Sequence, residues 1–222
     1  MWIEYAKSNQ NSAIREKIAS AIRVTMLISI PCAVGLAVLG KPIVSMLWSD
    51  TDTLAPQMLA VGTLCIVFYA LSTLGNGILQ GIGKMHVPII NAIIALVLHL
   101  GIYFVMLKGM KLDIFAVIYA NIFFSLIMCI LNHLAIHRYV GYKQELKKTF
   151  VLPVICSVVM GAICFGIFHL FALFTPEHVA CIIAICVSIV VYFGAMIIFK
   201  GCSKADLMGI PLIGKFLARV LP

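Results

Sequence analysis

Acidic side chains are scarce in this sequence, and the interiors of its long apolar stretches lack them. Only eight Asp and Glu residues occur, charged residues make up 11% of the chain, and hydrophobic residues make up 63%. A soluble domain is close to half apolar and a quarter charged. This composition excludes an ordinary soluble fold and indicates a polytopic membrane protein, because an unpaired carboxylate inside the hydrocarbon core costs several kcal/mol.

Motifs for catalysis and metal binding are also missing. The sequence has no G-x-S-x-G, no H-E-x-x-H and no P-loop, so nothing predicts an enzyme. The eight cysteines form no C-x-x-C, and seven lie in apolar stretches, which favours buried reduced thiols over zinc or disulfide chemistry. His133 and His137 have the spacing of a metal pair, but their place at a hydrated helix end explains them as well. We expect no cofactor and no metal.

Six stretches are long and apolar enough to cross a membrane. A hydrocarbon core of about 30 Å needs roughly 20 apolar residues per helix. The six stretches occupy residues 22–40, 58–80, 87–107, 113–136, 150–174 and 179–199. Asp113 stands at the first position of the fourth stretch, and the other acidic residues fall in connections and tails. The predicted fold class is therefore all-α, with six transmembrane helices.

Lys and Arg gather on one side of the predicted bundle. Of the 16 in the chain, three fall on the sparse side, namely Lys41, Lys108 and Lys111. The rest fall on the other side, namely Lys7, Arg15, Lys17, Arg23, Lys84, Arg138, Lys143, Lys147, Lys148, Lys200, Lys204, Lys215 and Arg219. By the positive-inside rule, both termini are predicted to be cytoplasmic. The net charge of +8 then reflects topology and does not indicate a nucleic-acid partner.

The connections divide the chain into five parts. We predict a cytoplasmic interfacial helix running into the first span (1–21), four transmembrane helices (22–136), a basic cytoplasmic loop (137–149), a transmembrane hairpin (150–199) and a cytoplasmic amphipathic tail (200–222). Within the hairpin, Thr175-Pro176-Glu177 predicts a helix start with a hydroxyl cap, Pro at the first helical position and an acid in the first turn.

Polar side chains recur on particular faces of the second, third and fourth stretches. They are Tyr69, Ser72, Thr73, Asn76 and Gln80, then Asn91 and His99, then Asn121, Ser125 and Asn132. Their spacings place the first and third sets each on one helix face, and Asn91 and His99, about 80° apart around the axis, share one broad face at most. Two interpretations remain open. The side chains bridge neighbouring helices at about 0.6 kcal/mol per contact, with Gly77-x-x-x-Gly81 allowing close backbone approach, or they line a hydrated cavity.

The segment Gly81-Ile-Gly83-Lys84-Met85-His86-Val87-Pro88 is too short for a structured loop. It predicts a tight cytoplasmic turn, with a glycine in left-handed geometry at the end of one helix and Pro88 near the start of the next.

At these residues the sequence resembles a known family. Leu79-Gln-Gly-Ile-Gly-Lys84 followed by Pro88 is similar to the LQG-x-GK-x-x-x-P signature of the stage V sporulation protein B and polysaccharide-biosynthesis (lipid II flippase-like) family. Further matching blocks are Ala21-Ile-Arg23 with Ser29-Ile-Pro31, Val34-Gly-Leu-Ala-Val-Leu-Gly-Lys-Pro-Ile43, Phe68-Tyr-Ala-Leu-Ser72, and Lys204-Ala-Asp-Leu207 with Pro211.

The resemblance implies a fold and a function. It implies that this chain supplies the last six helices of a fourteen-helix, two-lobe transporter in the bacterial plasma membrane, with an N-terminal half as partner. Such a flippase translocates a lipid-linked cell-wall or polysaccharide precursor by alternating access, and the last two helices border a groove for the lipid tail. The residues expected along the substrate path are Arg23, at the pyrophosphate, and Tyr69, Thr73, Asn76, Gln80, Asn91, His99 and Asn121.

Two other functions stay open at this point. A drug or cation antiporter of the same superfamily would want a membrane-embedded carboxylate for coupling, and the six stretches supply none in their interiors. A membrane subunit or scaffold that does not transport would need only the six helices and a partner.

Overall fold

The computed structural model describes residues 2–47, 54–110 and 113–199, with side chains from residue 12 onward. The elements are α1 (Trp2–Val38), α2 (Gly40–Leu47), α3 (Leu54–Gly81), α4 (His86–Phe104), a π-helical turn (Val105–Gly109), α5 (Phe115–Val140), a second π-helical turn (Lys147–Val151), α6 (Leu152–Ala172) and α7 (Glu177–Ile198). No strand occurs among these residues. Six helical segments are long and apolar enough to span a membrane, so the predicted all-α class with six spans is confirmed.

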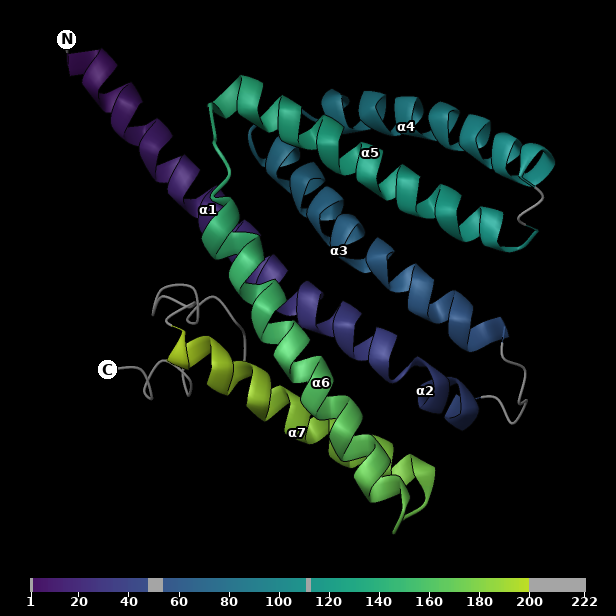
Figure 1. Cartoon of the computed structure of the whole chain (residues 1–222). Coiled ribbons are helices and arrows are strands. Elements are labelled where there is room, and N and C mark those ends of the chain that lie inside the picture. The colour runs from purple at the N-terminus through teal and green to yellow at the C-terminus, as the bar shows by residue number, and fades with distance from the viewer. Residues whose placement is uncertain (1, 48–53, 111–112, 200–222) are drawn as a thin grey trace.

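The long helix α1 lies between two groups of helices (Figure 1). On one side it packs on α3, and α5 packs on both α3 and α4. On its other side it packs on α6, which pairs with α7. The two groups therefore meet mainly through α1, and grooves on its flanks are bounded by helices distant in sequence.

The N-terminal part of α1 continues into the first span without a break at residue 21. Ile18 and Ile22 are buried in a cluster with Leu79, Ile136 and Tyr142. The Nε–H of Arg15 donates to the carbonyl of Val140, 2.7 Å away, at the C-terminal end of α5. The positive charge of Arg15 is also stabilised there by the negative end of the helix dipole. The N-terminal part of α1 therefore packs against α3 and α5.

The basic loop predicted over residues 137–149 is shorter in the structure. Helix α5 continues to Val140, with His137 and Arg138 in its last turn, where positive side chains complement the helix dipole. Gly141 ends it with φ +67° and donates to the carbonyl of His137. The next helical turn begins at Lys147, so only a short connection separates α5 from α6.

The predicted cap of the last helix was wrong in detail. Pro176 is the cap residue, with ψ 145°, and Glu177 is the first helical residue. The hydroxyl of Thr175 donates backward to the carbonyl of Phe171 at 2.8 Å. It therefore caps the end of α6 and does not cap the start of α7. The predicted tail over 200–222 lies outside the described residues.

The turn between α3 and α4 explains the glycine-rich signature. Gly83 has φ +76°, its N–H donates to the carbonyl of Gln80, and the N–H of Lys84 donates to that of Leu79. This pair of bonds is a Schellman motif with Gly83 at the left-handed position. The side chain of Leu79 is fully buried, and the ammonium of Lys84 lies 5.1 Å from the ring centre of Tyr139. The signature thus ends one helix and fixes the turn against α5.

Close approach between α3 and α5 occurs at Gly75. A Cβ built there would lie 3.0 Å from Cβ of Asn132, whereas at Gly77 and Gly81 it would meet nothing within 4 Å. The prediction that Gly77-x-x-x-Gly81 allows close packing was therefore wrong for the described helices, because these two glycines are exposed.

We expect Gly75→Ala to destabilise the protein by about 1–3 kcal/mol, since the added methyl group presses on Asn132 in a packed contact. Gly77→Ala serves as the matched control and should be neutral or slightly stabilising, because Ala favours the helix. Thermal unfolding in detergent measures both. Equal stability of the two variants would contradict the close approach.

Candidate functional site

Asn132 connects three helices through a buried hydrogen-bond network. Its Nδ2 donates to Oδ1 of Asn76 at 2.8 Å and to the carbonyl of Ser72 at 3.0 Å. Its Oδ1 accepts from Nδ2 of Asn91 at 2.9 Å. Asn132 is 1% exposed and Asn91 is 8% exposed. The geometry therefore favours the helix-bridging interpretation for Asn76 and Asn91, two residues expected along the substrate path.

His99 lies on the same face of α4 as Asn91 and also contacts α5. Its Nδ1 lies 2.9 Å from the carbonyl of Ala120. Since a carbonyl only accepts, Nδ1 carries the proton in this contact. The ring of His99 packs edge-on against Phe124, with centroids 5.6 Å apart, and Tyr69 packs on Phe124 from α3 at 6.3 Å. Phe124 therefore brings His99 and Tyr69 to one place.

The remaining polar side chains of the predicted path differ in exposure. Thr73 and Gln80 are exposed on α3, and Asn121 is half-buried on α5. Tyr69 is also exposed. These side chains take no part in the Asn132 network and remain accessible to a ligand.

Arg23 lies on α1 opposite the connection between α5 and α6. Its guanidinium is 3.7 Å from the carboxylate of Glu145. Tyr142, in the same connection, is 4% exposed, and its hydroxyl has no hydrogen-bond partner among the described residues. Burial raises the pKa of Tyr142, Glu145 raises it further, and Arg23 lowers it. The phenol therefore keeps its proton at neutral pH beside a paired cation.

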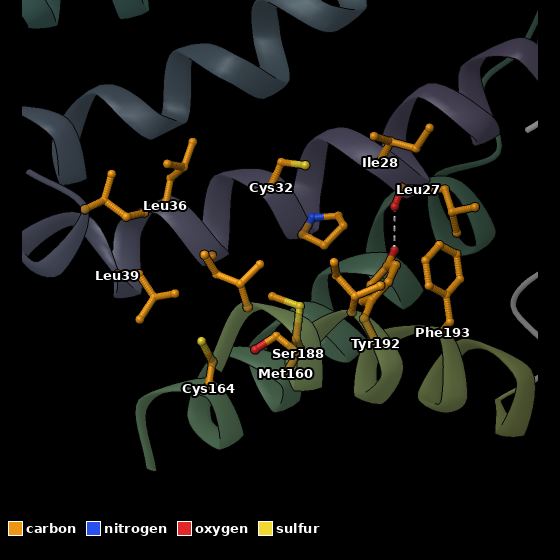
Figure 2. Close-up of a pocket in the computed structure, with 15 residues that line it drawn as sticks. Leu27, Ile28, Cys32, Leu36, Leu39, Met160, Cys164, Ser188, Tyr192 and Phe193 are labelled. Carbon is orange, nitrogen blue, oxygen red and sulfur yellow. Dashed lines mark hydrogen bonds between the residues drawn. The ribbon is translucent and has the colours of Figure 1, made fainter. Parts of the chain in front are cut away.

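An apolar groove of about 340 Å³ lies between α1, α6 and α7 (Figure 2). Its lining residues are Leu27, Ile28, Pro31, Cys32, Gly35, Leu36, Leu39, Ile43, Met160, Cys164, Ile185, Ser188, Ile189, Tyr192 and Phe193. The hydroxyl of Ser188 donates to the carbonyl of Ala184 at 2.6 Å, and that of Tyr192 donates to the carbonyl of Leu27 at 2.9 Å. Because these hydroxyls are bonded to backbone, the groove suits a hydrocarbon chain.

Pro31 explains the bond between Tyr192 and Leu27. In a regular helix the N–H of residue 31 would donate to the carbonyl of residue 27, but proline has no N–H. The carbonyl of Leu27 is therefore left without its helical donor, and α7 supplies the hydroxyl of Tyr192 in its place. Figure 2 shows this bond at one end of the groove.

We expect Tyr192→Phe to destabilise the protein by about 1 kcal/mol, since the carbonyl of Leu27 loses its donor. Pro31→Ala restores a backbone N–H, so the same Tyr192→Phe change should cost much less in that background. A double-mutant cycle on thermal or denaturant unfolding measures the difference. If the effects of Tyr192→Phe and Pro31→Ala on stability were additive, the hydroxyl of Tyr192 would not be replacing the N–H that Pro31 lacks.

The sequence model of the family described as "Lipid II flippase MurJ" matches residues 4–202. The match includes the groove, the asparagine network and the turn at Gly83. The chain belongs to the MurJ lipid II flippase family.

A curated relative supports the membership. The chain is 24% identical to the lipid II flippase MurJ of Bacillus subtilis (strain 168) over 159 residues. The alignment covers 69% of this chain and 29% of that protein, so the chain spans under a third of its MurJ relative. No solved structure matches the chain.

Three contacts at the candidate sites of this MurJ-family chain escaped sequence reasoning. Asn132 belonged to a recognised polar stripe, but its central place in the network depends on contacts with α3 and α4. Glu145 pairs with Arg23 across 122 residues of sequence. For the Tyr192 contact the sequence offered one signal: Pro31 within an apolar helix predicts a carbonyl one turn earlier that lacks its helical donor.

Proposed function

We propose that the gene product carrying this chain is a flippase that moves a lipid-linked cell-wall precursor of the lipid II type across the bacterial plasma membrane. The observation that carries the proposal is the MurJ family match over residues 4–202. Six helices able to span a membrane and an apolar groove agree with a substrate that carries a long hydrocarbon tail. A drug or cation antiporter is not favoured, since the family match is to lipid II flippases.

In this proposal the groove between α1, α6 and α7 holds the lipid tail. Its lining is apolar and its hydroxyls are bonded internally, so a polyprenyl chain would leave no polar group unpaired there. Its volume lies in the range of small-molecule pockets, and its open side would allow a longer chain to extend into the bilayer.

The headgroup would meet Arg23 at the basic end of the bundle and polar side chains spread along α3, α4 and α5. Arg23 would exchange its carboxylate partner Glu145 for the pyrophosphate, and a charge-assisted bond of this kind is among the stronger polar contacts. Tyr69, Thr73, Gln80, His99 and Asn121 would contact sugar or peptide. Asn76 and Asn91 would act through helix packing.

The cellular setting belongs to the same proposal. We place both termini in the cytoplasm on the basis of the distribution of Lys and Arg. The partner would be an N-terminal half that completes the two lobes, since alternating access requires two bodies that move against each other. The resemblance to the stage V sporulation protein B family favours a spore-cortex peptidoglycan precursor as cargo.

The test is flux of the precursor in cells depleted of their own flippase and supplied with the full gene product. We expect Arg23→Gln to lower translocation about tenfold, as for loss of a bond to a charged group, and Arg23→Lys to retain most of it. Glu145→Gln should not lower flux, because it removes only the competing partner. Unchanged flux in Arg23→Gln would remove Arg23 from the site, and failure of the wild-type gene product would overturn the proposed function.

A further inference from the structure

A second groove, of about 580 Å³, opens between α3, α5 and the start of the α6 segment. It shares no residue with the groove between α1, α6 and α7. The helices α3 and α6 do not pack on each other; α1 lies between them, and the connection after α5 closes one end of the groove. We refer to this space as the α3–α5 groove.

The wall of the α3–α5 groove changes character along its length. Phe68 and Leu71 of α3 lie 13 and 10 residues before the end of that helix at Gly81, or roughly 15–20 Å along its axis. Ile130 and Leu134 continue the apolar wall on α5. The apolar part therefore reaches about half the thickness of a hydrocarbon core, the depth of one lipid leaflet.

The other end of the groove carries one cation, the ammonium of Lys143. His133 and His137 line it there too, the Nδ1 of His137 lies 2.9 Å from the carbonyl of Tyr142, and no acidic residue lines the groove among the described residues. Lys143 is exposed and forms no ion pair among the described residues. Glu145 is close in sequence, but its carboxylate lies 3.7 Å from Arg23 of α1.

We propose that the α3–α5 groove binds an anionic phospholipid of the surrounding leaflet. One acyl chain lies along the wall of Phe68, Leu71 and Ile130, and the phosphate sits at Lys143. Charge complementarity selects the ligand, because basic pockets between transmembrane helices bind anionic headgroups, and each Lys or Arg near the surface contributes about a fivefold preference. The inference is independent of the proposed transport function.

The experiment measures quenching of an introduced tryptophan by brominated lipids in the full gene product reconstituted in vesicles. Phe68→Trp places the probe in the groove, and Val97→Trp places it at a similar depth on α4, where the side chain is exposed. The emission of the protein without an added tryptophan is subtracted. The lipids are brominated phosphatidylglycerol and brominated phosphatidylcholine.

We expect phosphatidylglycerol to be favoured about fivefold at Phe68→Trp, with no preference at Val97→Trp. Adding Lys143→Gln should abolish the preference. Lys148 lies five residues after Lys143, is exposed and does not line the groove. Lys148→Gln therefore removes the same charge outside the groove and should preserve the preference for phosphatidylglycerol. These controls separate a built site from general attraction to a basic surface.

Three results would overturn the proposal. Equal preference at the two tryptophan positions would mean ordinary contact with bilayer lipid. Absence of quenching at Phe68→Trp by either lipid would mean that another part of the protein fills the groove. Displacement of phosphatidylglycerol by an equimolar unbrominated polyprenyl-pyrophosphate precursor would make the groove a cargo site.

Discussion

Replacing Gly35 with Phe is expected to lower the proposed precursor translocation at least tenfold while the protein remains folded. Gly35 lines the groove between α1, α6 and α7, and a Cβ there would meet nothing within 4 Å. The Cβ atom meets no neighbour, and the aromatic ring would extend into the groove proposed for the lipid tail. An overpacking penalty of about 1–3 kcal/mol against the bound tail corresponds to a loss of roughly ten- to a hundredfold in flux.

Gly166→Phe on α6 is the matched control. A Cβ at Gly166 also meets nothing within 4 Å, but this glycine is exposed and does not line the groove. Both variants are compared for amount in the membrane, thermal stability and rescue of cells depleted of their own flippase. Full rescue by Gly35→Phe would show that the tail does not use this groove. Equal loss in the two variants would indicate a general effect of a bulky side chain.

Asn132→Leu is expected to destabilise the bundle by removing the centre of its interhelical hydrogen-bond network. The change removes three hydrogen bonds that join α5 to α3 and α4. At about 0.6 kcal/mol for each interhelical bond in a membrane protein, the loss is about 2 kcal/mol. The leucine side chain would also press on Gly75, where the two backbones are closest. Unfolding in detergent measures the difference in free energy.

Asn121→Leu is the control for this substitution, on the same helix. Asn121 is half-buried, and its side chain forms no hydrogen bond among the described residues. We therefore expect the free energy of unfolding of the Asn121→Leu variant to remain within about 0.5 kcal/mol of the wild type. A loss as large for Asn121→Leu as for Asn132→Leu would contradict the central place of Asn132.

The spans could be predicted from the sequence because their signal is local. Each needs only about 20 consecutive apolar residues, and five of the six appear in the structure within about four residues of the predicted bounds, whereas the first begins ten residues earlier, at Ser12. The turn at Gly83 was predictable for the same reason, since a left-handed position favours glycine whatever surrounds it. The polar faces of α3, α4 and α5 followed from helical spacing, but spacing could not decide between bridging and lining a cavity.

The remaining features depend on contacts between residues distant in sequence. The hydroxyl of Tyr192 reaches a carbonyl 165 residues away, and no local pattern specifies that α7 packs beside Pro31. The short helix α2 was not predicted, because Gly40 and Pro42 argue against a helix locally. Both are buried in the structure, and Gly40 packs against Pro56 and Leu59 at the start of α3. The two grooves likewise arise only when α1 is placed between the two groups of helices.

Photo-crosslinking of a labelled lipid-linked precursor to α7 tests the proposed tail site most directly. A photoreactive residue replaces Ile189, which lines the groove, or its neighbour Val190, which is exposed at the same depth outside it. In membranes that contain the full gene product, we expect strong labelling at Ile189 and little at Val190, with unlabelled precursor competing. Equal labelling at the two positions, or none at either, would contradict a flippase that holds its lipid tail between α1, α6 and α7.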